Sequence, residues 1–348
     1  MILDASTFEL VPAVAEFISA SEEMALPGRL KMELHASIVE LNTDICASAA
    51  EALSALRELR DAADSIARER GLRIAAAGSH PLAVPEELEI APDPRYEEFV
   101  AYAGPSARRQ GVSGLHVHIG MPSAEVCMRT LESVLPWLPL VLALSANSPY
   151  FRGRETGLAS NRAEVLAQLP RSGGPPAFAS YGEWERFVER FVALGLADGY
   201  TRFWWDIRPH PAFGTLEIRM PDQPTALEVT GAFLALLQTV CAAEHGPPSR
   251  DGAPSRGDYA QNRWAALRFG PRAELVHPDG DRMASVPELA AELLDRIAPT
   301  ARELGSEDLL ESFDSASSEG DRQLEVGRRE GLEAVCADLV ERTVRSNA

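Results

Sequence analysis

The segment from residue 202 to residue 222, RFWWDIRPHPAFGTLEIRMPD, constrains the fold more than any other part of the chain. Residues 202–210 and 214–222 both show a period of two and are joined by the tight turn PAFG, which predicts an antiparallel hairpin. Because helical segments surround this hairpin, we expect an α+β fold with a mainly antiparallel sheet rather than a doubly wound parallel sheet. The chain contains neither GxGxxG nor GxxxxGK[ST], so any nucleotide site must be built from sheet side chains.

Apolar spacing and turn residues predict the other elements. We expect strands over 30–43 (one strand or a pair), 72–84 and about 112–120, and helices over 48–71, 122–146, 180–194 and 225–244. Residues 85–95, 147–180 and 246–258 are predicted loops, the second with a short helix near 161–168, and the chain beyond 286 is predicted to be helical. The helix after Ser48 has a capping-box signature, S-x-x-E, and ends at Gly71.

Composition limits the function classes. The formal charge of −19 and pI near 4.8 argue against a general binder of nucleic acid or anionic membranes, which needs a basic footprint. Cys46, Cys127, Cys241 and Cys336 form no CxxC pair, which excludes a zinc ribbon, gives no disulfide framework and favours the reducing cytoplasm. The apolar run 134–146 is too short for a membrane span of about 20 residues and is expected to be a core helix.

Ionisable residues share faces on the predicted strands. Period two places Asp206, Arg208 and His210 together, Glu217 and Arg219 together, and His116 and His118 together. Each row alone is more often a solvated sheet face. Glu33 and Glu40 on another candidate strand change that balance, because carboxylates, imidazoles and guanidinium groups on one face suit Mg²⁺ and phosphate chemistry.

The glycine-rich stretch FRGRETGLASNR contains Arg152, Arg154 and Arg162 within an acidic chain. These arginines either balance nearby acids at the surface or form an anion clamp over phosphates, and the pattern leaves both readings open. His80, in GSHP, is more typical of a turn cap than of a catalytic group. The serines of this region lack a G-x-S-x-G elbow, which disfavours an α/β-hydrolase.

Several longer blocks resemble the glutamate–cysteine ligase type 2 family of bacterial carboxylate-amine ligases. The blocks are ELHASIVELNT, AAAGSHPLA, GLHVHIGMPS, LALSANSPYFRGRETGLASNRAEV, RFWWDIRPHPAFGTLEIRMPD and QNRWAALRFG, and the resemblance runs from about residue 1 to residue 345. It implies one domain over residues 1–348 with a glutamine-synthetase-like fold, an antiparallel sheet funnel with flanking helices that holds ATP and Mg²⁺. It also implies two steps, in which a carboxylate forms an acyl phosphate with ATP and an amine then displaces phosphate.

The resemblance assigns roles residue by residue. It implies metal ligands at Glu33, Glu40, His116 and Glu217, an ATP contact at His118 and a phosphate contact at Arg219. Arg152, Arg154, Arg162, Arg208 and Arg263 become candidates for the phosphates or for the substrate carboxylate. The implied partners are small molecules, glutamate and cysteine, with no nucleic acid and no membrane. The oligomeric state stays open, with a homodimer as one option.

One departure from the family pattern bears on activity. Members open with a strand reading G-V-E-E-E-[FL], whereas this sequence starts MILDASTFELVP, which is similar to the residues that follow that strand. Either the start codon is assigned too late or the strand and its metal carboxylates are missing. In the second case we expect weak Mg·ATP binding and poor turnover. Equal activity of this chain and of an N-terminally extended version would contradict that expectation.

Two other functions compete with a ligase. The first is a catalytically impaired or regulatory relative that keeps the fold, which Mg²⁺-dependent ADP release with glutamate and cysteine would exclude. The second is a metal-dependent hydrolase built on His116 and His118. HExxH and similar zinc clusters are missing from the sequence, and tightly held stoichiometric zinc would be needed to support that reading.

Overall fold

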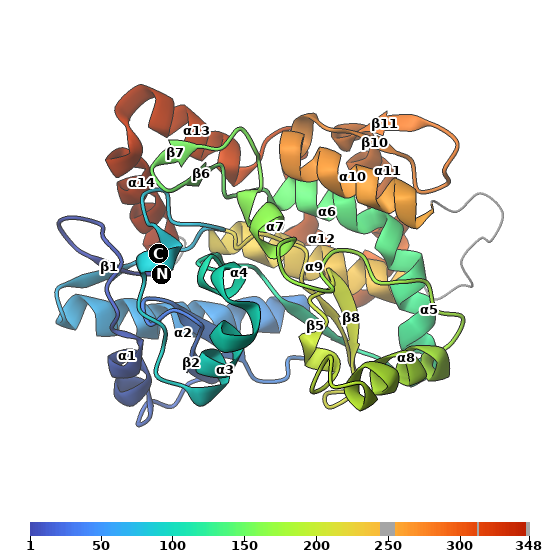
Figure 1. The fold of residues 1–348 in the computed structure, drawn as a ribbon. Coiled ribbons are helices and arrows are strands. Elements are labelled where there is room, and N and C mark those ends of the chain that lie inside the picture. The colour runs from blue at the N-terminus through green and yellow to red at the C-terminus, as the bar shows by residue number, and fades with distance from the viewer. Residues whose placement is uncertain (244–254, 312, 346–348) are drawn as a thin grey trace.

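Strands β5 (Val117–Gly120), β9 (Thr215–Ile218) and β8 (Ile207–His210) form a three-stranded antiparallel sheet near the middle of the molecule (Figure 1). The computed structural model describes residues 1–243, 255–311 and 313–345. Strands β8 and β9 are the predicted hairpin, which is confirmed, and β5 joins it on the other side of β9. Their register sets His118 and Arg208 on either side of Glu217.

The remaining strands form two-stranded sheets. They pair β1 (Ile2–Asp4) with β4 (Leu72–Ile74), β2 (Gly28–Met32) with β3 (Val39–Thr43), β6 (Tyr150–Phe151) with β7 (Arg154–Glu155), and β10 (Glu274–Val276) with β11 (Met283–Ser285). Every pairing between these named strands is antiparallel, which confirms the α+β, mainly antiparallel prediction. The strands are distributed over several small sheets.

Helices make up most of the rest of the described chain. They are α1 (Val14–Ser21), α2 (Ala49–Glu69), α3 (Pro94–Ala103), α4 (Pro105–Arg108), α5 (Ala124–Val134), α6 (Leu138–Ser145), α7 (Asn161–Leu166), α8 (Tyr181–Ala193), α9 (Leu227–Ala243), α10 (Arg256–Phe269), α11 (Val286–Leu304), α12 (Glu307–Leu310), α13 (Glu319–Glu330) and α14 (Leu332–Arg345). Short 3₁₀ turns cover Pro85–Glu87 (η1), Leu135–Trp137 (η2), Tyr200–Arg202 (η3) and Gly270–Arg272 (η4).

Alternation along the strands explains the main core. Val117, Leu216, Ile218 and Ile207 point to one side of the sheet and pack with helices α5, α6, α9, α10 and α11 in one hydrophobic cluster. Fully buried side chains of this kind contribute about 1.5–3 kcal/mol each. A second cluster holds β2, α1 and α2 together at the blue end of the chain (Figure 1). The core therefore covers one side of the central sheet and leaves its polar side uncovered by these helices.

Several predicted boundaries were wrong. The strand expected over 72–84 is only β4, and that over 112–120 is only β5. Gly78 instead forms backbone hydrogen bonds with Asn147 and Ser113, and Gly114 forms an isolated bridge with Asp222. The helix expected over 122–146 is broken at η2, where Pro136 removes a backbone donor. Helices α3 and α10 were not predicted. Glu244 and residues 246–254 of the expected loop lie outside the described residues.

The segment Ala124–Ser145 is long and apolar enough to cross a membrane by composition, but 72% of its most apolar window is buried inside the fold. It contacts α9, α10 and α11, as expected of a core helix.

Helix α3 links the two sides of the molecule. The Phe99 ring lies 5.4 Å from that of Trp204, and the hydroxyl of Tyr102 accepts a hydrogen bond of 3.0 Å from Arg171. Tyr96, on the same helix, donates its hydroxyl to the carbonyl of Met32 at 2.7 Å. These contacts set the β2–β3 pair against the central sheet.

Candidate active site

The polar side of the central sheet carries a compact group of ionisable side chains. We call this side the open face and define it by His116, His118, Arg208, His210, Glu217 and Arg219. The predicted sharing of faces within β8, β9 and the histidine strand is therefore confirmed, except for Asp206, which binds residues of α10 instead.

Glu217 is the centre of the open face. Its Oε2 accepts a hydrogen bond of 2.6 Å from Nε of Arg208, and its Oε1 accepts one from Nη1 of Arg219. Burial by itself would raise the pKa of Glu217, but the charges of Arg219 and Arg208 outweigh it and hold that pKa well below its usual range. Since Glu217 is only 3% exposed, it is a buried, ionised carboxylate shared by two guanidinium groups.

His116 and His118, two of the three histidines of the open face, are neutral at neutral pH. Desolvation by the surrounding protein and the neighbouring Arg219, whose Nη1 lies 3.4 Å from Nδ1, keep the pKa of His116 well below its usual value, although the side chain is exposed. Burial also lowers the pKa of His118, whose Nδ1 lies 2.9 Å from the Thr215 hydroxyl and whose Nε2 lies 3.9 Å from Glu217. With one carboxylate, two guanidinium groups and neutral imidazoles, the sheet side chains of this face leave an excess positive charge.

Glu33 and Glu40 approach the open face from β2 and β3. Glu33 directly follows β2, and its carboxylate accepts a hydrogen bond from the amide of Leu34. Desolvation by the surrounding protein raises the pKa of Glu33, and the charge of Glu40 raises it further. The charge of Arg219 offsets part of this rise. The side chain is nevertheless exposed, so solvent and ligands reach it. Glu33 and Glu40 repel each other, and Glu33 lies near Arg219 of the open face. Their carboxylate oxygens are ligands of the kind that a hard divalent cation prefers, and its charge would relieve the repulsion.

The four predicted metal ligands do not form a finished centre. Within residues 1–243, 255–311 and 313–345, no three carboxylate, imidazole or thiol groups lie close enough together to hold a metal ion. Both oxygens of Glu217 already accept from arginines, so Glu217 does not fit a metal in this arrangement, whereas Glu33 and Glu40 do. The metal role of all four residues stays a prediction.

Arg162 belongs to a buried network next to the open face. Its guanidinium donates to the carbonyls of Arg219 and Met220 at 3.0 and 3.1 Å and lies 3.8 Å from Asp222. Asp222, fully buried, accepts hydrogen bonds from the hydroxyls of Ser148 and Ser160 at 2.6 and 2.8 Å. A Cβ at Gly114 would overlap the Arg162 guanidinium, so the glycine that opens GLHVHIG lets this arginine pass over the backbone.

Arg263 is also buried in a paired network. It donates to Asp206 at 2.9 Å, and Tyr259 donates its hydroxyl to the same carboxylate at 2.8 Å. These contacts fix α10 against β8. In this arrangement the guanidinium groups of Arg162 and Arg263 hold protein groups, and their predicted role toward phosphates or substrate stays untested.

Arg152 and Arg154 lie in the β6–β7 hairpin. Arg152 has a positive φ of 53°, and its guanidinium pairs with Glu86, which also accepts from Arg109 at 2.9 Å. Arg154 is exposed. No hydrogen bond among the described residues joins either arginine to the open face. The predicted clamp over phosphates is therefore not assembled here, and its role stays a prediction.

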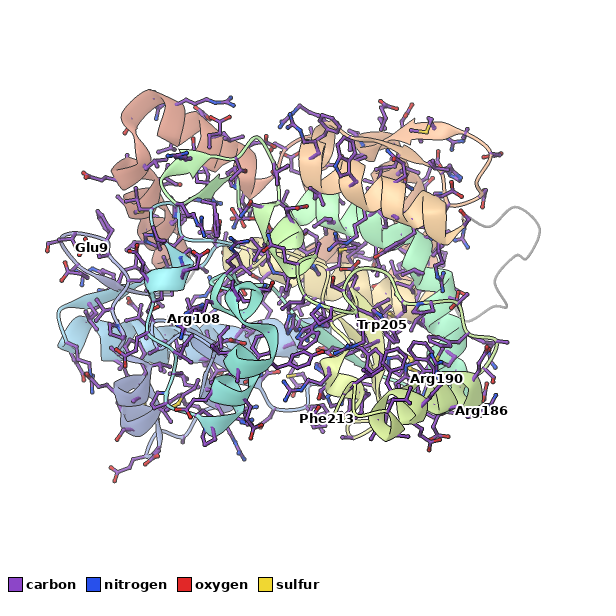
Figure 2. The ribbon with its side chains drawn as sticks, in the orientation of Figure 1. Glu9, Arg108, Arg186, Arg190, Trp205 and Phe213 are labelled. Carbon is purple, nitrogen blue, oxygen red and sulfur yellow. The ribbon has the colours of Figure 1, made fainter. Side chains whose placement is uncertain are left out.

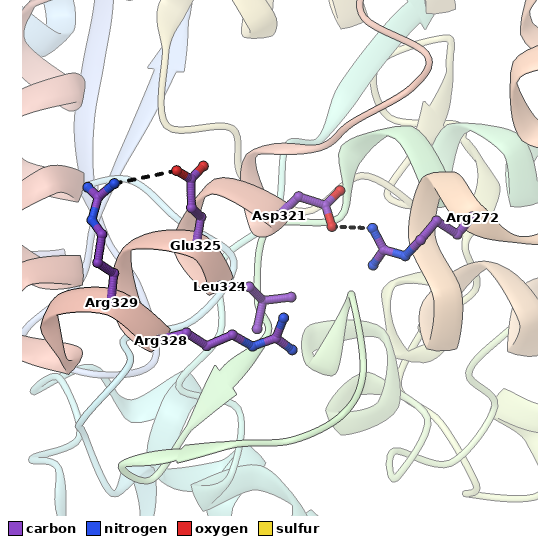
Figure 3. Close-up of a pocket in the computed structure, with 6 residues that line it drawn as sticks. All are labelled: Arg272, Asp321, Leu324, Glu325, Arg328 and Arg329. Atoms are coloured by element: carbon purple, nitrogen blue, oxygen red, sulfur yellow. Dashed lines mark hydrogen bonds and ion pairs between the residues drawn. The ribbon is translucent and has the colours of Figure 1, made fainter.

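Two cavities lie away from the open face. One of about 720 Å³ is lined by Arg272, Asp321, Leu324, Glu325, Arg328 and Arg329 (Figure 3). Its arginines pair with carboxylates, Arg272 with Asp321 at 2.5 Å and Arg328 with Glu155 at 2.6 Å, which leaves little charge for a ligand. The other, about 380 Å³, lies beside Tyr259 and Arg263. Several of the ionisable residues that the sequence motifs predicted to be functional lie on the open face instead.

Sequence reasoning missed Asp222 and Glu86, which position arginines that it did single out. Asp222 closes the block EIRMPD, and Ser148 and Ser160 stand in the arginine-rich block. The position of Asp222 at the end of a predicted strand with several ionisable residues was the signal that could have identified it. Glu86 lies in an acidic loop and carried no such signal.

The sequence of this chain matches a known protein family. Residues 1–337 match the glutamate-cysteine ligase family 2. A protein of Rubrobacter xylanophilus named "Putative glutamate--cysteine ligase 2-3" is 40% identical over 346 residues, which are 98% of this chain and 94% of that protein. A protein of Sorangium cellulosum named "Putative glutamate--cysteine ligase 2" is 36% identical over 98% of this chain and 93% of its own length.

Solved structures support the fold. A glutamate–cysteine ligase from Francisella tularensis in complex with AMP superposes with a TM-score of 0.67 at 14% identity, covering 100% of this chain and 87% of that chain. The Pup ligase PafA in complex with ADP superposes with a TM-score of 0.50 at 14% identity, covering 95% and 73%. The glutamine-synthetase-like fold expected from the sequence is confirmed. The match over almost the whole chain, together with relatives above 30% identity, shows that the chain belongs to the glutamate-cysteine ligase family 2.

Proposed function

We propose that the protein is an ATP-dependent carboxylate-amine ligase that joins the γ-carboxylate of glutamate to the amine of cysteine. The open face is the observation that carries this proposal: Arg208 and Arg219 converge on one buried carboxylate and leave an excess positive charge on a sheet surface open to solvent. Family membership supports the reaction class, and the relatives' names support the choice of glutamate and cysteine.

In the proposed first step, a glutamate carboxylate oxygen attacks the γ-phosphorus of ATP, which forms an acyl phosphate and releases ADP. In the second, the cysteine nitrogen attacks the acyl carbon, the C–O bond to phosphate breaks, and an amide, phosphate and a proton result. The protein supplies positioning and charge, because phosphoryl transfer needs little covalent chemistry from side chains. Arg219, partly exposed and adjacent to His116, is the guanidinium best placed to meet the transferred phosphoryl group.

Other open-face groups hold Arg219 ready. Glu217 binds it from one side, and Arg208 fixes Glu217 while donating to the carbonyls of Thr201 and Phe203 at 2.8 and 2.9 Å. The neutral His116 accepts from Arg219 without adding a competing charge. Mg²⁺, when bound, would neutralise part of the phosphate charge, and Glu33 and Glu40 are the residues that fit it.

A cytoplasmic location is part of the proposal. All four cysteines lie in the described ranges and are free thiols, as expected in a reducing compartment.

The decisive experiment measures ADP release by the purified chain with Mg²⁺, ATP, glutamate and cysteine, with product mass determined in parallel. We expect ADP release that needs both amino acids and a product with the mass of their condensed dipeptide. Arg219→Ala is expected to abolish this signal, whereas Arg186→Ala, an exposed arginine on α8 (Figure 2), serves as the matched control and is expected to keep it. A screen of other acids and amines tests the substrate pair. Activity with another pair alone would overturn glutamate and cysteine but keep the ligase.

A second candidate function is a relative that binds nucleotide without turning it over. The lack of a three-ligand metal group among the described residues favours it. Saturable binding of ATP combined with no ADP release for any acid and amine would establish this second function and overturn the first.

A further inference from the structure

A cluster of aromatic rings lies at the outer end of the open face. We call it the ring cluster and define it by His118, Tyr200, His210 and Phe213. Phe213 stacks on His210 with ring centroids 4.2 Å apart and planes 18° apart, and the His118 ring lies 5.5 Å from Phe213 and 5.1 Å from His210. Tyr200 meets His210 edge-on at 5.1 Å. Since His118 also faces Glu217, the ring cluster continues the charged part of the open face directly.

Phe213 is exposed without a structural need for its ring. Its side chain is 68% exposed, and within the described chain it belongs to none of the hydrophobic clusters. The turn that carries it is well tied, with Phe213 N bonded to the His210 carbonyl at 3.1 Å and Met121 N bonded to the Gly214 carbonyl at 3.0 Å. Gly214 supplies the positive φ of 65° that the turn requires. A firmly held turn therefore presents an apolar ring to solvent beside a charged site (Figure 2).

The surface next to the rings has room for a flat ligand. Gly120 pairs with Thr215 at the end of β5, and open space lies where a Cβ on Gly120 would point. Gly120, Thr215 and His210 lie in one row across the three strands, and the ring centroids of His118 and His210 are 5.1 Å apart beside this row. Aromatic rings beside a bare backbone position favour stacking of a planar base.

Along the open face, the side chains change from charged groups at one end to aromatic rings at the other. Arg219 and His116 lie at the inner end, Glu217 and Arg208 in the middle, and Thr215 with the ring cluster at the outer end. From Arg219 to Thr215 the strand covers about 14 Å, at about 3.4 Å per residue. An extended nucleoside triphosphate has the same order, with its anionic chain at one end and its planar base at the other.

We propose that the ring cluster is the binding site for the purine base of the nucleotide substrate, with Phe213 as the ring on which the base stacks. This inference rests on the proposed use of ATP. It adds a residue that the sequence motifs did not single out and gives Phe213 a role in affinity for the base, separate from the arginines that meet the phosphates.

The test is calorimetric titration of the whole chain with Mg²⁺ and either ADP or pyrophosphate, which lacks the base. Phe213→Ala is expected to weaken ADP binding about tenfold, in the range that alanine replacement of stacking rings gives, and to leave pyrophosphate binding unchanged. Phe213→Trp should restore ADP affinity, and the fluorescence of F213W should change with ADP but not with pyrophosphate. Phe269→Ala, which removes another partly exposed ring, is the matched control and should change neither affinity.

The possible results separate the two proposals. If the wild-type chain binds ADP and F213A binds it equally well, the stacking role is overturned while ATP use stands. If F213A loses pyrophosphate affinity as strongly as ADP affinity, Phe213 acts through the fold, and the stacking role is likewise overturned. If the wild-type chain binds neither ADP nor pyrophosphate, both the stacking role and the proposed ATP use are overturned.

Discussion

Two groups of arginines and carboxylates lie next to each other along the segment that contains β9, and they differ in how completely they are paired. Beyond the end of β9, Asp222 receives hydrogen bonds from Ser148, Ser160 and the amide of Asn147, while Arg162 donates to backbone carbonyls. On the open face, one carboxylate, Glu217, serves two guanidinium groups. Identical residue types therefore build a scaffold where every group is satisfied and a ligand site where charge is left over.

The largest effect is expected from breaking the buried group. Asp222→Ala leaves the Arg162 guanidinium and two serine hydroxyls without their buried acceptor, which we expect to reduce the free energy of unfolding by about 3–5 kcal/mol. Urea denaturation measures this. Asp198→Ala, which removes an exposed ion pair with Arg202, is the matched control and should cost about 0–1 kcal/mol. An equal decrease in the free energy of unfolding in both variants would show that the buried Asp222 network stabilises the fold no more than an exposed ion pair does.

Removal of Arg219 tests the group on the open face. Arg219→Ala is expected to lower kcat by about 10²–10³, because a charge aimed at the transferred phosphoryl group is lost. The free energy of unfolding should change little, since Glu217 keeps Arg208 as its partner. Steady-state kinetics and urea denaturation of the same preparation check both halves. A kcat close to that of wild type, with only KM raised, would assign Arg219 to ground-state binding instead.

Acidification should destabilise the protein through the buried His35 and His80 and, to a smaller extent, through His116 on the open face. Burial lowers the pKa of His35 and His80 to about 4, and that of His116 falls well below its usual value. Such a group binds its proton more readily in the unfolded chain, so the free energy of unfolding falls as pH drops below about 6.5, by up to about 1.4 kcal/mol per pH unit for each of the buried His35 and His80. The contribution of His116 is smaller, because its side chain is exposed and solvent screens the charges around it. Denaturation across this pH range measures the slope.

Pyrophosphate sharpens that measurement. A bound anion favours the protonated form of His116 and should make the slope shallower by the His116 contribution, whereas His35 and His80 should respond as before. His116→Gln should show the shallower slope without the anion. A slope that pyrophosphate leaves unchanged would separate His116 from the phosphate site.

The smallest effect concerns Glu33. Glu33→Gln removes repulsion from Glu40 and should raise the free energy of unfolding by at most about 1 kcal/mol, because solvent that reaches the side chain screens the charges. Thermal unfolding without Mg²⁺ measures this gain, with the exposed Glu9→Gln as control (Figure 2). Mg²⁺ should stabilise the wild-type chain more than E33Q. The same Mg²⁺ effect in both would remove Glu33 from the metal site.

The spacing of residues close together in the sequence predicted those elements whose structure is determined by nearby residues. The hairpin, the side chains that share its open face and the helix capped by Ser48 all follow from spacing over a few residues. The capping box itself was half right, because Glu51 accepts from Ala47 N rather than from Ser48. Whole-chain resemblance supplied the fold, which no local spacing could give.

The pairing of charges could not be predicted in this way. Arg162 and Arg219 look alike in the sequence, and only the approach of β9 and α7 shows that the first is buried against Asp222. Phe213 was predicted as a turn residue, and its contact with His118 depends on strands far apart in the chain. Side-chain roles that depend on such long-range pairing need the structure.

The order of the strands has a consequence for how the protein folds. Arg208 and Glu217 are 9 residues apart, but His118 and Thr215 are 97 residues apart. Closing the longer loop costs about 2 kcal/mol more chain entropy, so we expect the hairpin to form early and β5 to join it late. A folding chain would then become compact and helical before it can hold a nucleotide. In refolding experiments, recovery of ADP binding should lag behind recovery of the far-ultraviolet signal.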